Sequence, residues 1–248
     1  MSKCLIVTGG GRGIGAEVSR KAAKQGYSVC VNFHRDQTSA QKLVRELEEN
    51  GANALAYQAD VSQEEEVEAL FETVEKDLGT PEALVNNAGI LDLQTRVDGM
   101  NAERIQRIFA VNVTGSFLCA REAVKRMSTK YGGTGGSIVN LSSGAAKYGS
   151  PGEYVDYAAS KAAIDTLTIG LAREVAEEGI RVNAVRPGFI DTEIHQSGGE
   201  PDRMERVRPL VPMKRVGQAE EVADAIMWLL SDKASYTTGT ILDVSGGR

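Results

Sequence analysis

The sequence has few of the residues that cross-link small secreted proteins or bind metal ions. Its 248 residues include three cysteines, Cys4, Cys30 and Cys119, and two histidines, His34 and His195. The odd number of cysteines excludes complete pairing within the chain, and their apolar surroundings predict buried free thiols in a reducing compartment. No cysteines and histidines cluster at ligand spacing, so we predict no zinc or other metal site. We expect a cytoplasmic protein.

Long apolar runs and basic runs are also missing. No apolar stretch reaches the roughly 18 residues that a membrane-spanning helix needs, and the N-terminal stretch lacks the layout of a signal peptide. The formal net charge is −6, which argues against nucleic acid and anionic membranes as partners. The hydrophobic content of 42% is ordinary for a globular protein. The length suits one large domain covering residues 1–248.

Short apolar runs alternate with longer helical patterns along the whole chain. This alternation predicts the α/β class, with a Rossmann-type doubly wound parallel sheet in a single three-layer domain. The predicted strands are 4–7, 28–32, 54–59, 82–86, 137–141, 180–185 and 240–244. The first predicted helix ends near residue 25, the second covers 38–50 and the third begins near 62. The fourth covers 101–127, the fifth contains Tyr157 and ends near 178, and the last covers 218–230. Ser62 and Glu65 have the spacing of a capping box at the start of the third helix.

The longest irregular region is 192–217, which contains three of the six prolines. Loops of this length inside compact domains are usually functional. We expect a mobile substrate lid, and an excursion without function is the alternative.

Glycines mark the turn between the first strand and the first helix. Gly9, Gly13 and Gly15 form the pattern Gly-x-x-x-Gly-x-Gly there. Such glycines let backbone amides approach a pyrophosphate, and the helix N-terminus favours the anion. We interpret the turn as a dinucleotide-binding loop, with a merely tight turn as the alternative.

The second strand ends without the acidic residue that usually binds the 2′-hydroxyl of NAD. Phe33 occupies the expected position, and the first carboxylate is Asp36. Arg12 and Arg35 could together hold a 2′-phosphate. The sequence therefore predicts NADP rather than NAD, unless both arginines are ordinary surface residues.

Tyr157 and Lys161 lie four residues apart, so a helix places both side chains on one face. A lysine beside a tyrosine favours the phenolate and should lower the phenol pKa. Ser143 ends an apolar run and could share a substrate oxygen with the phenol. Such a group moves a proton at a carbonyl or carbinol oxygen but cannot move a hydride, so a cofactor is required. A half-buried tyrosine beside a solvated lysine is the alternative.

These motifs, taken together, resemble the short-chain dehydrogenase/reductase family in its compact branch of about 250 residues. The resemblance covers essentially the whole chain. The motifs that carry it are Thr8 to Gly15, Asp60-Val61, Asn86 to Gly89, Asn112, Ser143, Tyr157 to Lys161, Pro187-Gly188 and Thr192.

The resemblance implies reversible hydride transfer between a nicotinamide and an alcohol or carbonyl. Tyr157 would be the general acid/base, and Ser143 would orient the substrate oxygen, with Ser142 as the second candidate. Lys161 would hold the nicotinamide ribose, and Asn112 would hold a water molecule that relays protons. The implied cofactor-binding residues are Thr8, Gly9, Arg12, Gly13, Ile14, Gly15, His34, Arg35, Asp60, Val61, Asn87, Ala88, Gly89, Tyr157, Lys161, Pro187, Gly188, Ile190 and Thr192.

The resemblance also implies a homotetramer acting on a small carbonyl or alcohol. A sugar (glucose-type) dehydrogenase and a 3-oxoacyl-thioester reductase remain alternatives, and an NADP-binding redox sensor without turnover is the alternative from another class. The expected pocket residues are Leu91, Leu93, Gln94, Ala145, Tyr148, Tyr154, Phe189 and His195.

Two departures from the family pattern concern the substrate. The interval from Ser143 to Tyr157 is one residue longer than usual, which places an extra residue near 153–156. Glu177 and Glu178 stand where reductases of carrier-protein substrates commonly have an arginine, and they should oppose an acidic carrier protein. A carrier-protein substrate stays among the alternatives because the chain also has three cations that could contact it, Arg121, Lys125 and Arg126.

Overall fold

The computed structural model describes residues 3–192 and 203–248. In these residues, seven parallel strands form one sheet in the order β3-β2-β1-β4-β5-β6-β9. The strands are β1 (Cys4–Val7), β2 (Ser28–Phe33), β3 (Ala54–Gln58), β4 (Pro81–Asn86), β5 (Gly136–Leu141), β6 (Ile180–Pro187) and β9 (Ile241–Val244). The central strands are apolar and almost wholly buried because helices cover both faces of the sheet.

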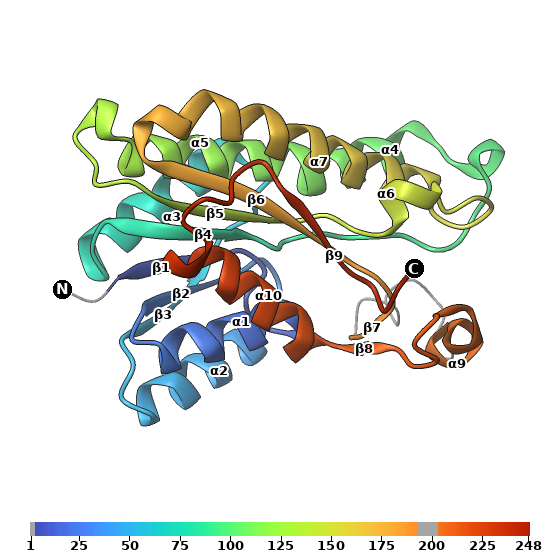
Figure 1. Cartoon of the computed structure of the whole chain (residues 1–248), viewed down its shortest axis with the longest axis horizontal. Helices are drawn as coiled ribbons and strands as arrows, with labels where there is room; N and C mark the ends of the chain where they lie inside the picture. The colour runs from blue at the N-terminus through green and yellow to red at the C-terminus, as the bar shows by residue number, and fades with distance from the viewer. Residues whose placement is uncertain (1–2, 193–202) are drawn as a thin grey trace.

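The helices lie in two layers, one on each face of the sheet (Figure 1). One layer contains α1 (Gly13–Lys24), α2 (Gln37–Glu49) and α10 (Ala219–Leu230), and one apolar cluster joins it to the sheet. The other layer contains α3 (Glu64–Asp77), α4 (Ala102–Phe109), α5 (Gly115–Met127) and α7 (Val155–Val175), and a second apolar cluster joins α3, α5 and α7 to the sheet. The predicted doubly wound, three-layer fold is confirmed.

The predicted helix over 101–127 contains a change of helical period. A π-helical segment, Ala110–Thr114, joins α4 to α5. Such segments widen one turn and often occur at functional sites. Asn112 lies within this segment and is completely buried.

The predicted capping box at Ser62 is wrong. Helix α3 begins at Glu64, and its N-cap Gln63 makes no side-chain cap bond. The Ser62 hydroxyl donates instead to Asp60 Oδ1 at 2.8 Å, and the Ser62 amide donates to the same oxygen at 3.0 Å. A local side-chain turn therefore competes successfully with the cap.

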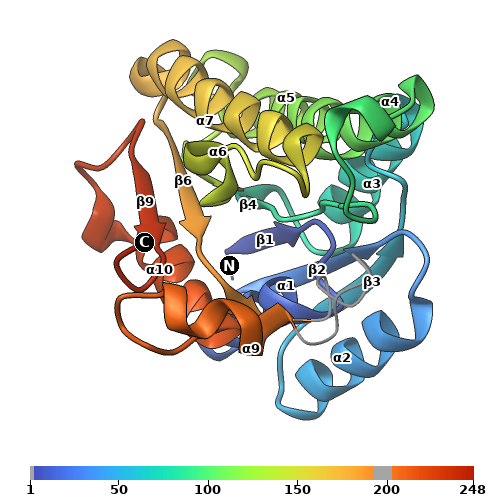
Figure 2. The same cartoon turned by 90° about the vertical axis from the view of Figure 1, so that its right-hand side faces the viewer.

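The carboxyl ends of the strands meet at one edge of the sheet, where the chain order reverses between β1 and β4. Ligands of open parallel sheets bind at such a reversal. Figure 2 shows this edge, with α6 (Ala145–Tyr148) and α7 on one side of the strand ends and α9 (Arg203–Val207) on the other. A short parallel pair, β7 (Ile190–Asp191) and β8 (Gly217–Gln218), lies near α9.

The expected lid, 192–217, falls partly outside the described residues, which omit 193–202. From residue 203 the region is more regular than the sequence suggests, because it contains α9, a 3-10 turn (Arg208–Leu210) and β8. These elements place the lid region beside the carboxyl edge of the sheet (Figure 1).

The three cysteines are buried and free, as predicted. Burial raises the pKa of the Cys4 and Cys119 thiols to about 12, so both are protonated and inert at neutral pH. Across the described residues, the helices are too short or too polar to cross a membrane.

Candidate active site

The glycine loop packs so closely against the chain that side chains do not fit. Gly9 and Gly13 have φ values of +60° and +51°, which strain most other residues. A Cβ atom on Gly15 would lie 2.6 Å from both Asn87 Nδ2 and the Gly9 carbonyl oxygen. The loop is therefore a backbone cradle at the N-terminus of α1, the arrangement that a pyrophosphate requires.

Asn87 and Thr8 join this loop to the chain that follows β4. Asn87 Nδ2 donates to the carbonyl oxygens of Thr8 and Gly9 at 2.8 and 2.9 Å. Thr8 Oγ1 accepts from the amides of Asn87 and Ala88, both at 3.0 Å. The two sides of the chain reversal thus form one hydrogen-bonded unit.

The ends of β2 and β3 form the next part of the cradle. Asn32 is buried, and its Oδ1 accepts from the Gly9 amide at 3.2 Å. His34 Nε2 lies 3.7 Å from Asp60 Oδ2. Val61 packs against α5, because a Cβ on Gly115 would lie 2.7 Å from Val61 Cγ2.

The two arginines predicted to hold a 2′-phosphate, Arg12 and Arg35, are both exposed near this end. No carboxylate of the described residues forms an ion pair with either of them. The nearest acidic residue in sequence, Asp36, instead caps α2 by accepting from the Ser39 amide at 3.0 Å. Both guanidinium groups are therefore available to an anion.

The structure brings Ser143 and Tyr157 together, although they lie on different elements. The Ser143 hydroxyl lies close enough to the Tyr157 phenol to favour its ionised form. Ser142 points elsewhere: its hydroxyl is buried and donates to the Lys161 carbonyl oxygen at 3.1 Å. The geometry therefore favours Ser143 over Ser142 as the serine that meets a substrate oxygen.

Lys161 is only 4% exposed, which excludes a solvated lysine at this position. Its Nζ donates to the Leu141 carbonyl oxygen at 2.7 Å, at the end of β5. A Cβ on Gly89 would lie 3.4 Å from this Nζ and 3.5 Å from Asn112 Oδ1. Gly89 thus leaves a narrow space beside both polar groups.

Asn112 holds the chain after β4 in place. Its Oδ1 accepts from the Ile90 amide at 2.8 Å, and its Nδ2 donates to the Ile90 carbonyl oxygen at 2.9 Å and to Ser160 Oγ at 3.0 Å. Ser160 Oγ in turn donates to the Tyr157 carbonyl oxygen at 2.7 Å. The π-helical segment therefore connects α7 to the chain that follows β4.

The expectation of a lowered phenol pKa is wrong for this structure. Burial raises the pKa of the Tyr157 phenol, and the neighbouring Ser143 hydroxyl and the charge of Arg203 offset the rise only in part. Burial also lowers the pKa of the Lys161 ammonium to about 8, with Asp165 opposing the change. Desolvation dominates because both groups lie inside the fold.

The remaining predicted cofactor residues follow β6. Pro187 is buried at the end of that strand, and its carbonyl oxygen accepts from the Gly144 amide at 2.9 Å. A Cβ on Gly188 would lie 2.8 Å from Ser245 Cα. Ile190 is buried in β7, and Thr192 is half-buried directly after it. Of the expected pocket residues, His195 lies outside the described residues.

Two arginines at this edge carry a structural role that the sequence did not reveal. Arg104 Nε lies 2.7 Å from Asp156 Oδ2, and Arg104 Nη1 donates to the Leu93 carbonyl oxygen at 2.5 Å. Asp156 Oδ1 accepts from the Tyr157 amide at 2.9 Å. Arg203, on α9, is 7% exposed and pairs with Glu153 at 2.7 Å. Both acidic partners lie in the stretch 153–156, where the chain has one residue more than the family pattern. That extra residue was the one signal in the sequence that could have pointed to these pairs.

Replacing Arg104 with methionine should destabilise the protein by about 3–5 kcal/mol, because the buried Asp156 carboxylate loses its charge partner. The side chains of this pair are only 10% and 2% exposed. The matched control is Arg96→Met, whose pair with Asp98 is 80% and 73% exposed and should contribute less than about 1 kcal/mol. Urea unfolding measures both, and equal effects would contradict the assignment.

The buried Lys161 predicts a stability that rises with pH. Its pKa of about 8 in the folded chain lies below the value of 10.5 in water, so the unfolded state binds this proton more tightly. Between about pH 8 and 10.5 the wild type should therefore gain roughly 3 kcal/mol relative to Lys161→Met. Unfolding of both proteins at pH 7, 9 and 10.5, at one protein concentration, measures the difference. A constant difference would show that Lys161 titrates normally.

The chain is similar to known oxidoreductases over its whole length. A family model described as enoyl-(acyl carrier protein) reductase matches residues 9–248. An uncharacterized oxidoreductase, YgfF of Escherichia coli K12, is 57% identical over 98% of both chains. A 3beta-hydroxysteroid dehydrogenase of Eggerthella lenta is 42% identical over 99% of this chain and 93% of its own. Glucose 1-dehydrogenase 2 of Bacillus subtilis is 38% identical over 99% and 94%. With the parallel sheet and the site described above, these matches show that the chain is an oxidoreductase of the short-chain dehydrogenase/reductase family.

Proposed function

We propose that the protein is an NADP(H)-dependent enzyme that interconverts an alcohol and a carbonyl, with Tyr157 as general acid/base. One observation carries the proposal: the hydroxyls of Ser143 and Tyr157 meet at the carboxyl edge, on the same edge as a glycine cradle that excludes side chains. A nicotinamide bound there would supply or accept the hydride.

In the direction of reduction, Tyr157 donates its proton to the substrate oxygen while Ser143 orients that oxygen. The raised pKa of the phenol keeps it protonated at neutral pH, which is the form that reduction needs. In the direction of oxidation the phenolate is required, so the cationic form of Lys161 assists by favouring it. Asn112 would hold the water molecule that returns protons to Lys161.

The cofactor would lie along the chain reversal, from β3 to β6. The glycine loop would hold the pyrophosphate, and Asp60 and Val61 would contact the adenine. Lys161 and Tyr157 would hold the nicotinamide ribose, and the segment after β6 would flank the ring. The residues proposed to line this path are Thr8, Gly9, Gly13, Ile14, Gly15, His34, Asn87, Ala88, Gly89, Pro187, Gly188, Ile190 and Thr192.

We infer NADP rather than NAD from charge. Arg12 and Arg35 are exposed at the end of the cradle without carboxylate partners among the described residues. The Asp36 carboxylate accepts a bond from the Ser39 amide as the cap of α2, and it remains one negative charge beside two guanidinium groups, so positive charge is in excess at this end. Two guanidinium groups match the geometry and charge of that phosphate.

A substrate on a carrier protein is disfavoured by the charges along α5. Arg121, Lys125 and Arg126 are the cations that an acidic carrier protein would contact, yet each is paired within the chain. Glu122 contacts all three, at 3.0, 2.7 and 2.8 Å. The other partners are Glu64, Glu68 and Glu75. A free small carbonyl or alcohol fits this surface better, and the relatives named for glucose and for a steroid keep a sugar or another ring alcohol as the second candidate.

We also infer a homotetramer. Apolar side chains lie exposed on the outer helical layer, with Ile105 on α4, Phe117 on α5 and Ile169 on α7 at 40%, 49% and 37% exposure. These helices lie side by side in Figure 1, so another copy could cover all three. A stable monomer in light scattering would contradict this assembly. The cytoplasmic location stays a prediction from the free thiols.

Tyr157→Phe should cut kcat for carbonyl reduction by at least ~100-fold, because the general acid is lost. NADPH affinity, measured by fluorescence titration, should stay nearly unchanged. Tyr131→Phe is the control, since that ring is 61% exposed outside the site. Activity of Tyr157→Phe within a few-fold of wild type would refute the assignment. Failure of the wild type to oxidise NADPH across a broad carbonyl panel would instead favour a redox sensor.

Replacing Arg12 and Arg35 with alanine should lower kcat/KM for NADPH by about 10- to 100-fold, the scale of lost charge-assisted hydrogen bonds. The value for NADH should change by much less, because its ribose carries no 2′-phosphate. Steady-state kinetics with both cofactors at one ionic strength measure the two effects. A wild-type preference for NADH would overturn the cofactor assignment.

A further inference from the structure

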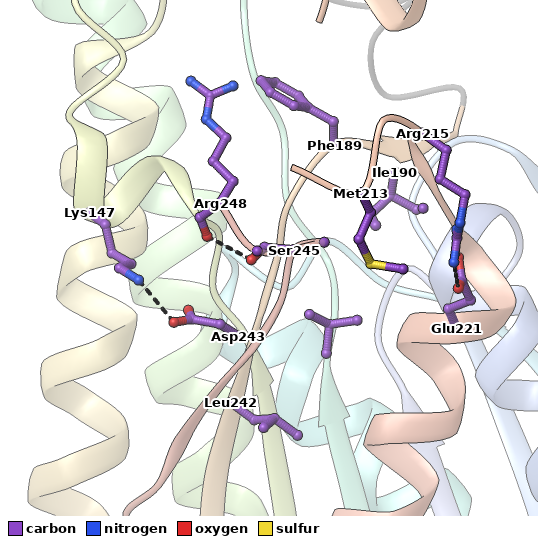
Figure 3. Close-up of a pocket in the computed structure, with 14 residues that line it drawn as sticks. Lys147, Phe189, Ile190, Met213, Arg215, Glu221, Leu242, Asp243, Ser245 and Arg248 are labelled. Carbon is purple, nitrogen blue, oxygen red and sulfur yellow. Dashed lines mark hydrogen bonds and ion pairs between the residues drawn. The ribbon is translucent and has the colours of Figure 1, made fainter. Parts of the chain in front are cut away.

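A pocket of about 610 Å³ opens at the carboxyl edge of the sheet, on the side of β9. We call it the Phe189 pocket after an aromatic residue in its lining. Figure 3 shows its lining: apolar side chains from the segments around β6, β7 and β9, together with three cations and two carboxylates. The charged residues are Lys147, Arg215, Glu221, Asp243 and Arg248.

Two of the three cations are neutralised inside the pocket. Lys147 Nζ lies 2.9 Å from Asp243 Oδ2. Arg215 holds both carboxylate oxygens of Glu221, at 2.6 and 2.8 Å. Both pairs are drawn as dashed lines in Figure 3.

Arg248 differs from both. No carboxylate of the described residues forms an ion pair with its guanidinium, and its Nη1 is enclosed without a hydrogen-bond partner. Figure 3 shows the side chain extended toward Phe189 and away from Asp243. An enclosed cationic donor without an acceptor costs free energy, so such a group needs an explanation.

Aromatic rings hold the Arg248 guanidinium in place. It lies 4.5 Å from the centre of the Phe189 ring and 5.2 Å from that of Tyr148. Contacts of this kind stabilise the cation without using its N–H donors. The planar fork is therefore held in place with its donors free, which is the preparation that binding of a carboxylate or phosphate requires.

The same rings connect Arg248 to the catalytic groups. Tyr148 ends α6, and its Cε2 would lie 3.6 Å from a Cβ on Gly144, the residue after Ser143. Phe189 directly follows Gly188, in the segment proposed to flank the nicotinamide. The Tyr148 ring therefore lies near both the Arg248 guanidinium and the chain directly after Ser143. This neighbourhood would let one substrate reach both groups.

We propose that Arg248 binds an oxyanion group of the substrate, a carboxylate or a phosphate, while the carbonyl or alcohol of the same molecule lies at Ser143 and Tyr157. This inference rests on the proposed function, because it names the substrate class of the same site. Arg203 adds positive charge near Phe189, 5.7 Å from the centre of its ring, although Glu153 already pairs with it. The preferred substrates are therefore oxo acids, hydroxy acids or sugar phosphates rather than their neutral analogues.

The test compares charged aldehydes with their neutral counterparts. With NADPH as reductant, kcat/KM is measured for 3- and 4-carboxybenzaldehyde and for their methyl esters, and for glyceraldehyde 3-phosphate and glyceraldehyde. The wild type should prefer at least one charged form by about 10-fold or more. Arg248→Gln should lower that charged-to-neutral ratio by about 10- to 100-fold, the scale of a hydrogen bond to a charged group. The carboxylate and phosphate pairs show which oxyanion is preferred.

Arg45→Gln is the control, because it removes one positive charge, as Arg248→Gln does, but from α2 outside the pocket. It should leave the ratio unchanged. A wild-type ratio near one, or a ratio that Arg248→Gln does not lower, would overturn the inference while leaving the oxidoreductase proposal in place.

Absence of turnover with every aldehyde would instead count against the proposed function. Calorimetric titration with benzoate, benzamide and inorganic phosphate then tests the subsite directly. Binding of benzoate or phosphate that Arg248→Gln weakens at least 10-fold supports it, and no difference between benzoate and benzamide, together with no phosphate binding, overturns it.

Discussion

The active site depends on the docking of one helix against the end of one strand. Lys161 Nζ on α7 donates to the Leu141 carbonyl oxygen at the end of β5, and Ser142 Oγ donates back to the Lys161 carbonyl oxygen. These two bonds fix α7, which contains Tyr157, against the strand that leads to Ser143. The meeting of Ser143 and Tyr157 follows from this docking, since neither residue lies near the other in sequence.

The polar groups of the fold gather where the parallel strands end. Lys161, Asn112 and Asp156 are buried there, and the Arg104 side chain is only 10% exposed. Burying such groups costs free energy unless each finds a partner, and nearly all of them do. Among the described residues, enclosed side-chain atoms without a hydrogen-bond partner occur on Asn86, Gln94, Asp165 and Arg248, and Arg248 is the cation of this group. Departures from otherwise consistent packing are expected at functional sites.

The sequence was enough to predict the sheet, because buried parallel strands are short apolar runs between helices. It also led to the prediction that Ser143, Tyr157 and Lys161 act together, because a motif preserves spacing along the chain. It failed where the outcome depends on competing local bonds, as at Ser62. It did not reveal the π-helical segment, since one extra residue in a turn hardly changes an apolar pattern. The prediction of a lowered phenol pKa was wrong because the direction of the shift depends on burial. The Arg104–Asp156 pair was missed because it joins residues 52 positions apart.

The central claim is that the phenol of Tyr157, the hydroxyl of Ser143 and the reactive carbon of a nicotinamide converge on one substrate oxygen and its carbon. A crystal structure of the protein with NADP⁺ and an alcohol bound tests it most directly. We expect the alcohol oxygen within about 2.6–3.2 Å of both hydroxyls, and its carbon beside the nicotinamide ring. A cofactor bound with its nicotinamide away from Tyr157, or an alcohol oxygen that contacts neither hydroxyl, would contradict the account.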